Sequence, residues 1–266
     1  MYRTNYHRAS SVADAVKQIS RAEDGKFVSG GMTLIPAMKL RLAAPSDLVD
    51  LRHVPELMGI KVSGSTVTIG AGVTHAQVAV HDKIRAACPA LTHLASLIGD
   101  PHVRYMGTIG GSIANNDPAA DYPAAMLALD ATIVTDKREI PAASFFTGLF
   151  ETALKDGEMV TAVTFTAPAK AGYEKFRNPA SRYAMTGVFV AQGKNGVRVA
   201  VTGAGDSGVY REKTLEAALA KKFDASALDG IKLPADNMMS DIHASAEYRA
   251  NLVVVMAKRA VAAANR

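Results

Sequence analysis

The chain has 266 residues, of which 48% are hydrophobic and 21% are charged, and its formal net charge at pH 7 is +5. This length and composition predict a well-packed globular protein, built as two or three small domains or one large one. Because no run of Lys and Arg is interleaved with aromatic residues, the mild basic charge does not indicate a nucleic-acid-binding surface.

The sequence contains one cysteine, Cys88, which lies at the expected end of a helix. A single cysteine excludes an intrachain disulfide, and alone it cannot hold an iron–sulfur cluster or a zinc site of thiolates, so a small buried thiol is expected. The histidines show no metal-ligand spacing, and Gly-x-Ser-x-Gly is absent. No segment approaches eighteen consecutive apolar residues and the N-terminus has no hydrophobic signal region, so we expect a soluble, cytoplasmic chain without a membrane span.

The pattern of apolar residues predicts three parts. Residues 1–57 form a small α/β unit with a helix over 13–22, a strand over 26–28, a helix over 34–40 and a strand over 48–51. Residues 58–168 contain a hairpin at 60–69, helices over 74–87, 90–98 and 122–129, an irregular stretch over 99–121, and strands over 132–135 and 159–166. After a linker at 168–172, residues 169–266 form strands over 173–176, 187–191 and 197–202 and helices over 212–220 and 245–263.

Two glycine-rich turns stand out, at residues 29–33 (SGGMT) and 108–112 (TIGGS). Gly-Gly pairs can expose backbone N–H groups to an anion and allow its close approach. One such pair is more often an ordinary tight turn. Two of them, the second followed by the asparagines and aspartates of residues 113–121 (IANNDPAAD), predict two walls of one site for a dinucleotide pyrophosphate. Neither turn has the Gly-x-Gly-x-x-Gly spacing of the doubly wound dinucleotide fold or the Gly-Lys-Ser/Thr of a triphosphate loop, so another architecture is required.

These two motifs resemble those of the FAD-binding medium subunit of bacterial molybdenum hydroxylases, such as carbon monoxide dehydrogenase and bacterial xanthine dehydrogenase. Residues 29–36 (SGGMTLIP) and 107–121 (GTIGGSIANNDPAAD) match the two motifs of that family, and the similarity continues through 173–176 (YEKF) into the C-terminal part. Met32 stands where the family more often has Thr or His, and Ser112 stands where Asn is usual. Binding is unaffected if these positions use backbone N–H groups, and weakened if the Asn amide normally holds the cofactor.

The resemblance implies an α+β fold, with a two-part FAD-binding domain of the vanillyl-alcohol oxidase type and a C-terminal α+β domain. It also implies which residues contact non-covalently bound FAD. These are Ser29, Gly30, Gly31, Met32, Thr33, Leu34, Thr108, Ile109, Gly110, Gly111, Ser112, Asn115, Asp117, Asp121, Val160, Lys175 and Tyr183. No separate catalytic base and no metal site are expected in this chain.

For several of these residues a purely structural interpretation competes. Asp121 would bind ribityl or adenosine hydroxyls, or it could simply cap the helix at 122–129. Lys175 would stabilise the reduced flavin, or it could be a surface lysine of a strand. Tyr183 would stack on the flavin ring, or it could be a buried core tyrosine. Asn115 and Asp117 could be turn formers only.

The resemblance further implies electron transfer. A molybdopterin large subunit oxidises the substrate, an iron–sulfur small subunit with [2Fe–2S] clusters relays electrons, and FAD in this chain passes them to NAD, a quinone or oxygen. The assembly would be a dimer of heterotrimers. A free-standing FAD-dependent oxidase and a non-catalytic nucleotide-binding module are the alternatives.

Overall fold

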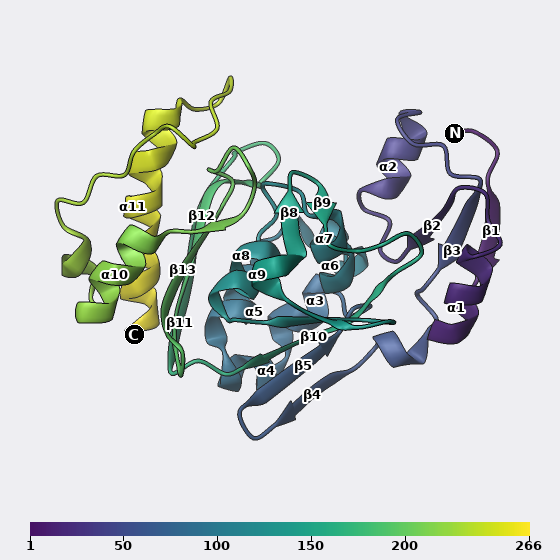
Figure 1. Cartoon of the computed structure of the whole chain (residues 1–266), viewed down its shortest axis with the longest axis horizontal. Coiled ribbons are helices and arrows are strands. Elements are labelled where there is room, and N and C mark those ends of the chain that lie inside the picture. The colour runs from purple at the N-terminus through teal and green to yellow at the C-terminus, as the bar shows by residue number, and fades with distance from the viewer.

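The computed structural model describes residues 1–266, and its N-terminal lobe is a small parallel sheet with helices. Strands β1 (Asn5–Arg8), β3 (Asp47–Asp50) and β2 (Gly25–Val28) lie in the order β1-β3-β2, all parallel. Helix α1 (Val12–Ile19) begins at Ser11, whose hydroxyl accepts from the Asp14 N–H, and α2 (Leu34–Lys39) follows the first glycine motif. This lobe stands apart at one end of the molecule (Figure 1).

The central part contains an antiparallel sheet surrounded by short helices. Its strands, in the order β4-β5-β10-β6-β7, are β4 (Ile60–Ser63), β5 (Thr66–Gly70), β10 (Val160–Thr166), β6 (Thr132–Thr135) and β7 (Glu139–Pro141). The helices are α3 (His75–Val80), α4 (Asp82–Ala87), α5 (Pro89–Ser96), α6 (Pro101–Met106), α7 (Ile109–Asn115), α8 (Tyr122–Ala128) and α9 (Ala142–Phe145). A 3-10 turn η1 (Pro55–Leu57) and a hairpin of β8 (Phe146–Gly148) and β9 (Glu151–Thr152) complete it.

The C-terminal part is an antiparallel sheet covered by helices. Its strands are β11 (Lys170–Arg177), β12 (Ala184–Gly193), β13 (Gly196–Thr202) and β14 (Tyr210–Arg211), followed by α10 (Lys213–Lys221), η2 (Ala225–Leu228) and α11 (Ala246–Ala264). The long helix α11 runs along one face of this sheet (Figure 1). It approaches β11 so closely that a Cβ on Gly172 would lie 1.9 Å from the Ala260 carbonyl oxygen, so only glycine fits there.

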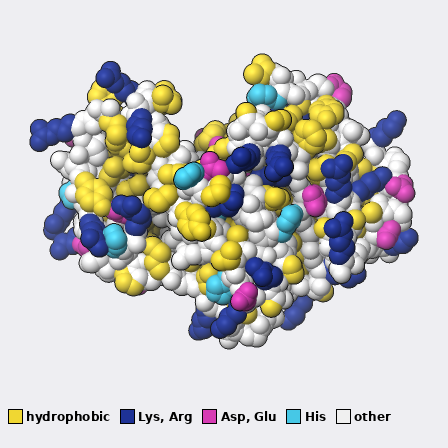
Figure 2. Space-filling model, turned by 180° about the vertical axis from the view of Figure 1, so that it is seen from behind, with side chains coloured by type: hydrophobic (Ala, Val, Ile, Leu, Met, Phe, Trp, Pro, Cys, Tyr) yellow, Lys and Arg dark blue, Asp and Glu magenta, His cyan; other side chains and the backbone are white.

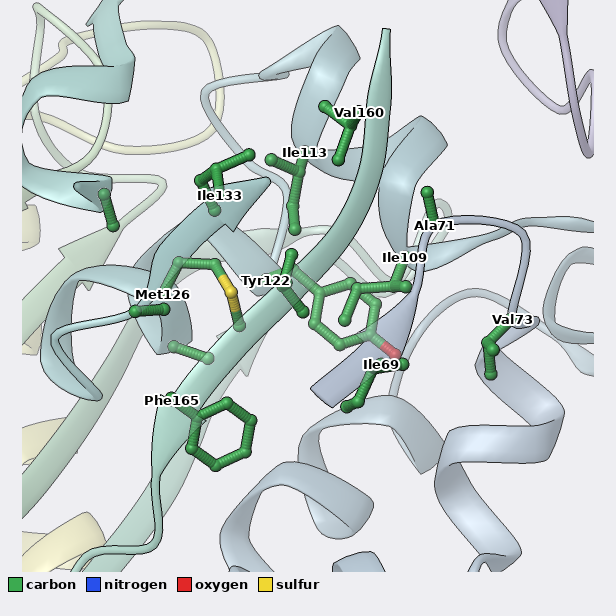
Figure 3. Packing of buried hydrophobic residues seen from close by; sticks show 14 of the residues in the cluster. Ile69, Ala71, Val73, Ile109, Ile113, Tyr122, Met126, Ile133, Val160 and Phe165 are labelled. Carbon is green, nitrogen blue, oxygen red and sulfur yellow. The ribbon is translucent and has the colours of Figure 1, made fainter. Parts of the chain in front are cut away.

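One hydrophobic core joins the N-terminal lobe, the central sheet and the inner face of the C-terminal sheet. Its middle is α8, whose residues are all buried, with Tyr122 and Met126 packed against strands β6 and β10 and against α7 (Figure 3). A second core lies between β12, β13, α10 and α11. The cores therefore fix α7 and the start of α8 rigidly, and those two segments carry much of the second glycine motif.

Two expectations about the helices are wrong. The helix expected over 74–87 is broken at His81, whose extended backbone ends α3 and whose Nδ1 accepts from the Ile84 N–H to begin α4. The stretch expected to be irregular over 99–121 contains α6 and α7. These helices are hard to predict from the sequence because they are short and because α7 contains glycines. The side chains of Asp100 and Thr108 cap them. The expected linker is also shorter than predicted, because β11 already begins at Lys170.

Candidate functional site

A cavity of about 730 Å³ lies where the N-terminal lobe meets the central part and the turn that joins β11 to β12. Figure 2 shows a notch beside the N-terminal lobe, which stands at the left of that view. The volume lies in the range of small-molecule and cofactor sites. Of the residues that the sequence assigns to a cofactor, all line this cavity except Ile109 and Lys175. Ile109 is instead fully enclosed in the core.

The two glycine motifs touch each other. A Cβ on Gly30 would lie 2.1 Å from the Met106 carbonyl oxygen and 2.7 Å from the Cα of Gly107. No side chain can be accommodated at such distances without moving the backbone. Glycine at position 30 therefore allows the first turn to lie directly against the loop that leads into the second motif, and the two segments form adjoining walls of one cavity.

The first motif presents unused hydrogen-bond donors. The backbone N–H groups of residues 29–34 donate to no atom of the protein. The Ser29 hydroxyl is also buried and has no partner. Gly31 has a φ of +70°, a left-handed conformation that glycine adopts without strain. A run of free N–H groups along a cavity wall is an arrangement that binds anions.

The second motif differs from the expected turn, because its glycines lie in the first turn of α7. The N–H groups of Ile109 and Gly110 donate to the carbonyl oxygens of Val73 and Ala71, at 3.0 and 2.9 Å. Those of Gly111 and Ser112 donate to the hydroxyl and carbonyl oxygens of the capping Thr108. Of the N–H groups of residues 108–112, only that of Thr108 is free.

The glycines of the second motif do not provide free N–H groups; they provide space for close packing and for the cavity. A Cβ on Gly110 would lie 2.4 Å from the Ala71 Cβ, so Gly110 allows α7 to pack against the end of β5. A Cβ on Gly111 would meet only the Thr108 hydroxyl, at 3.0 Å, and would otherwise extend into the open cavity. Ser112 also lines the cavity, where its hydroxyl makes no hydrogen bond within the protein and its N–H is used inside α7. Met32 lines the cavity too, and its N–H is free.

Asp121 is the buried carboxylate of the site. It occupies the N-cap position of α8 but makes no side-chain cap hydrogen bond, so the capping interpretation is wrong. Its Oδ1 accepts from the Tyr173 hydroxyl and lies 2.8 Å from Lys175 Nζ, whose side chain is only 2% exposed. Burial raises the pKa of Asp121, and the Lys175 ammonium opposes that shift. Lys175 is therefore neither a surface lysine nor a residue that lines the cavity. Its connection with the cavity is the ion pair with Asp121, which does line it.

The turn between β11 and β12 supplies a third wall. Ser181, Arg182 and Tyr183 line the cavity, and Tyr183 is 46% exposed, so the interpretation as a core tyrosine is wrong. Partial burial and the charges of Asp117 and Asp121 raise the pKa of Tyr183. Arg182 has a φ of +63° and brings a guanidinium to the cavity. The turn thus adds an aromatic ring and a cationic residue to the lining of a cavity that also contains the free N–H groups of residues 29–34.

Sequence reasoning missed His75 and Arg182, which also line the cavity. His75 is far from either motif in the sequence, but its backbone N–H donates to the Gly107 carbonyl oxygen at 3.0 Å. The β5–α3 connection thus pairs with the second motif through the isolated bridge between Thr74 and Thr108, and no pattern in the sequence indicates this pairing. Cys88 behaves as expected, since it is fully buried and burial raises the pKa of its thiol to about 12.

The structure contains no group of three or more His, Cys, Asp and Glu residues that is placed to hold a metal ion. None of its helices has both the length and the apolarity needed to cross a membrane.

Residues 2–168 match the family described as the FAD binding domain in molybdopterin dehydrogenase. The chain belongs to this family. It is 35% identical over 273 residues to the carbon monoxide dehydrogenase medium chain of Afipia carboxidovorans, covering 97% of this chain and 95% of that protein. It is 31% identical over 270 residues to the glyceraldehyde dehydrogenase medium chain of Sulfolobus acidocaldarius, covering 96% of each.

A solved structure confirms the α+β fold. Carbon monoxide dehydrogenase from Hydrogenophaga pseudoflava, in a form lacking the Mo-pyranopterin moiety of the molybdenum cofactor, contains a chain that matches with a TM-score of 0.86 and 34% identity. The match covers 99% of this chain and 97% of that chain. The family resemblance is therefore confirmed, and the chain is an FAD-binding medium subunit of a molybdenum hydroxylase, an oxidoreductase.

The cavity fits FAD on its own chemistry. The diphosphate of FAD needs several donors at one place, and the free N–H groups of residues 29–34 with the unpartnered Ser29 hydroxyl provide them. Ribityl and ribose hydroxyls need an acceptor, and Asp121 Oδ2 lines the cavity without accepting any hydrogen bond from the protein. Apolar lining at Leu57, Val160 and Tyr183 suits an aromatic ring system.

Proposed function

We propose that this chain carries FAD between the two glycine motifs and transfers electrons through it to an external acceptor. The observation that supports this most strongly is the direct contact of Gly30 with Met106 and Gly107, which places the free N–H groups of residues 29–34 opposite the start of α7 in one cavity. Bound FAD would supply the redox chemistry, because a flavin accepts electrons singly or in pairs.

The residues of the chain would bind and orient this cofactor. The N–H groups of residues 29–34 and the free N–H of Thr108 would hold the diphosphate, while Gly111 leaves room for its passage. Asp121 would accept from cofactor hydroxyls, held in place by Tyr173 and Lys175. Asn115, Asp117 and Val160 would line the remaining wall, with Tyr183 over the ring.

We expect the flavin to be bound non-covalently. Neither motif contains a histidine in the sequence, yet the fold brings His75 beside Gly107. It is nevertheless only 5% exposed, and its backbone pairs with the second glycine motif, where we place the diphosphate and not the flavin ring. Acid precipitation of the purified yellow protein should therefore leave the polypeptide colourless and release intact FAD into the supernatant. Flavin that stays with the denatured chain would contradict this prediction.

We propose two partners, an iron–sulfur small subunit and a molybdopterin large subunit, in a dimer of heterotrimers. The similar proteins are named medium chains, and one solved relative belongs to an enzyme with a molybdenum cofactor. A [2Fe–2S] cluster takes four protein ligands, usually cysteines, whereas this chain has one cysteine and it is buried.

Native mass spectrometry of the untagged protein from its source cells should show this chain in a complex with both partners. Reduction of that complex through the large subunit should bleach the flavin absorbance, and reoxidation by NAD, a quinone or oxygen would identify the acceptor. A lone monomer that turns over a substrate by itself would favour a free-standing oxidase. A chain that binds the nucleotide without redox turnover would favour a binding module.

A further inference from the structure

His75 is a buried imidazole held at the junction of the two motifs. It is the first residue of α3, where Thr74 and Gln77 form a capping box, and its backbone N–H is bound to the Gly107 carbonyl oxygen. Its ring lies 5.4 Å from that of Tyr122, between centroids. The capping box and the backbone bond fix both the start of the helix and the direction of the side chain.

Neither ring nitrogen of His75 has a hydrogen-bond partner in the protein. Nδ1 is completely enclosed and unpartnered. Nε2 lies on the side of Gly107, where a Cβ would come within 2.6 Å of it. Because His75 also lines the cavity, the space that Gly107 leaves open joins Nε2 to the site. A ligand oxygen beside Nε2 would therefore give this imidazole its first hydrogen bond.

The groups around Nε2 indicate which part of the ligand would lie beside it. Gly107 contacts Gly30, and residues 29–34 present their free N–H groups in the same region. Two further groups of this junction without a partner in the protein, the buried Ser29 hydroxyl and the Thr108 N–H, can also donate a hydrogen bond. A ligand that satisfies all of them offers several acceptor oxygens at one place, as a diphosphate does.

We infer that His75 donates a hydrogen bond from Nε2 to the diphosphate of FAD, as the one imidazole donor beside backbone N–H groups and the Ser29 hydroxyl. This inference rests on the proposed function. Burial, aided by the charge of Arg104, lowers the pKa of His75 to about 4. The imidazole is therefore neutral near pH 7, with one nitrogen protonated, and Nε2–H is the tautomer that pairs with a phosphate oxygen.

The test uses the flavin-free form of the complex in which the chain is isolated, with the His75→Phe and His75→Gln variants. Phenylalanine keeps a ring against Tyr122 but removes the donor, whereas glutamine retains an N–H donor. His102, exposed on the neighbouring α6, provides the matched control His102→Gln. Dissociation constants are measured for FAD, for ADP, which carries the diphosphate, and for riboflavin, which lacks it.

The His75→Phe variant should bind FAD and ADP about 10- to 100-fold more weakly, the size of a hydrogen bond to a charged group, and should bind riboflavin as the wild type does. His75→Gln should lose less, and His102→Gln nothing. Unchanged FAD binding by His75→Phe, or an equal loss for riboflavin, would overturn the inference. If His75→Phe fails to fold, His75→Gln decides alone: weaker binding of FAD and ADP with unchanged riboflavin binding supports the inference, and unchanged FAD binding or an equal loss for all three ligands overturns it. A wild-type complex that binds no FAD would instead refute the proposed function.

Discussion

Replacing Gly111 with valine is expected to abolish FAD retention while the chain remains folded. The new side chain meets only the Thr108 hydroxyl at its Cβ and extends into the cavity, where we place the diphosphate. Since the residue lies in the first turn of α7 with an ordinary helical backbone, valine introduces no backbone strain there. Flavin absorbance per chain after gel filtration measures the loss, and the thermal midpoint of the flavin-free form should change by no more than a few degrees.

The neighbouring glycine gives the contrasting result. Gly110→Val forces a Cβ to within 2.4 Å of the Ala71 Cβ, so it should lower the free energy of unfolding by about 1–3 kcal/mol or more. Gly193→Val is the control, because no atom lies within 4 Å of a Cβ there and the residue is outside the cavity. If Gly111→Val retained wild-type flavin, the α7 wall would not be part of the FAD site.

Replacing Lys175 with methionine is expected to lower the free energy of unfolding by about 3–5 kcal/mol near pH 8. Methionine keeps much of the length of the side chain but leaves the buried Asp121 carboxylate without the ammonium that lies 2.8 Å away. Removing one member of a buried ion pair is costly because the other remains charged in an apolar environment. Urea denaturation of the full chain, followed by circular dichroism, measures this change.

The loss should shrink as the pH falls. In the variant, burial without Lys175 raises the folded-state pKa of Asp121 further above its ordinary value near 3.8. The folded state then binds the proton more tightly than the unfolded state, so stability is gained as pH falls through the folded-state pKa and is complete below about 3.8. The double variant Lys175→Met with Asp121→Asn should regain most of the stability at pH 8. A single variant as stable as wild type at pH 8 would contradict the buried pair.

Local sequence patterns predicted the longest strands and helices, but they missed the short strands β1, β7, β8, β9 and β14. The hairpin expected over 60–69 is that of β4 and β5, and the helix expected over 13–22 is α1, which ends earlier, at Ile19. The patterns failed over 99–121, where α6 and α7 have six and seven residues and glycines occupy helical positions. Intrinsic propensity disfavours glycine in a helix, but packing of Gly110 on Ala71 decides the structure there.

The residues of the site could be predicted only in part, because some of them come from distant parts of the sequence. The contiguous motifs at 29–34 and 108–121 can be recognised in a single sequence, and residues of both line one cavity. Side chains that arrive from elsewhere, namely His75 from α3 and Arg182 from the β11–β12 turn, carry no local signal. The role of Lys175 also depends on tertiary structure, because only the fold shows that Asp121 stands between it and the cavity.

The central claim is that the two glycine motifs hold one diphosphate between them. A cryo-EM or crystal structure of the purified, yellow complex tests it most directly. We predict density for the FAD diphosphate within hydrogen-bonding distance of the N–H groups of residues 29–34 and beside Gly111, with the flavin ring under Tyr183. A diphosphate bound elsewhere, with residues 29–34 still facing solvent, would contradict the account.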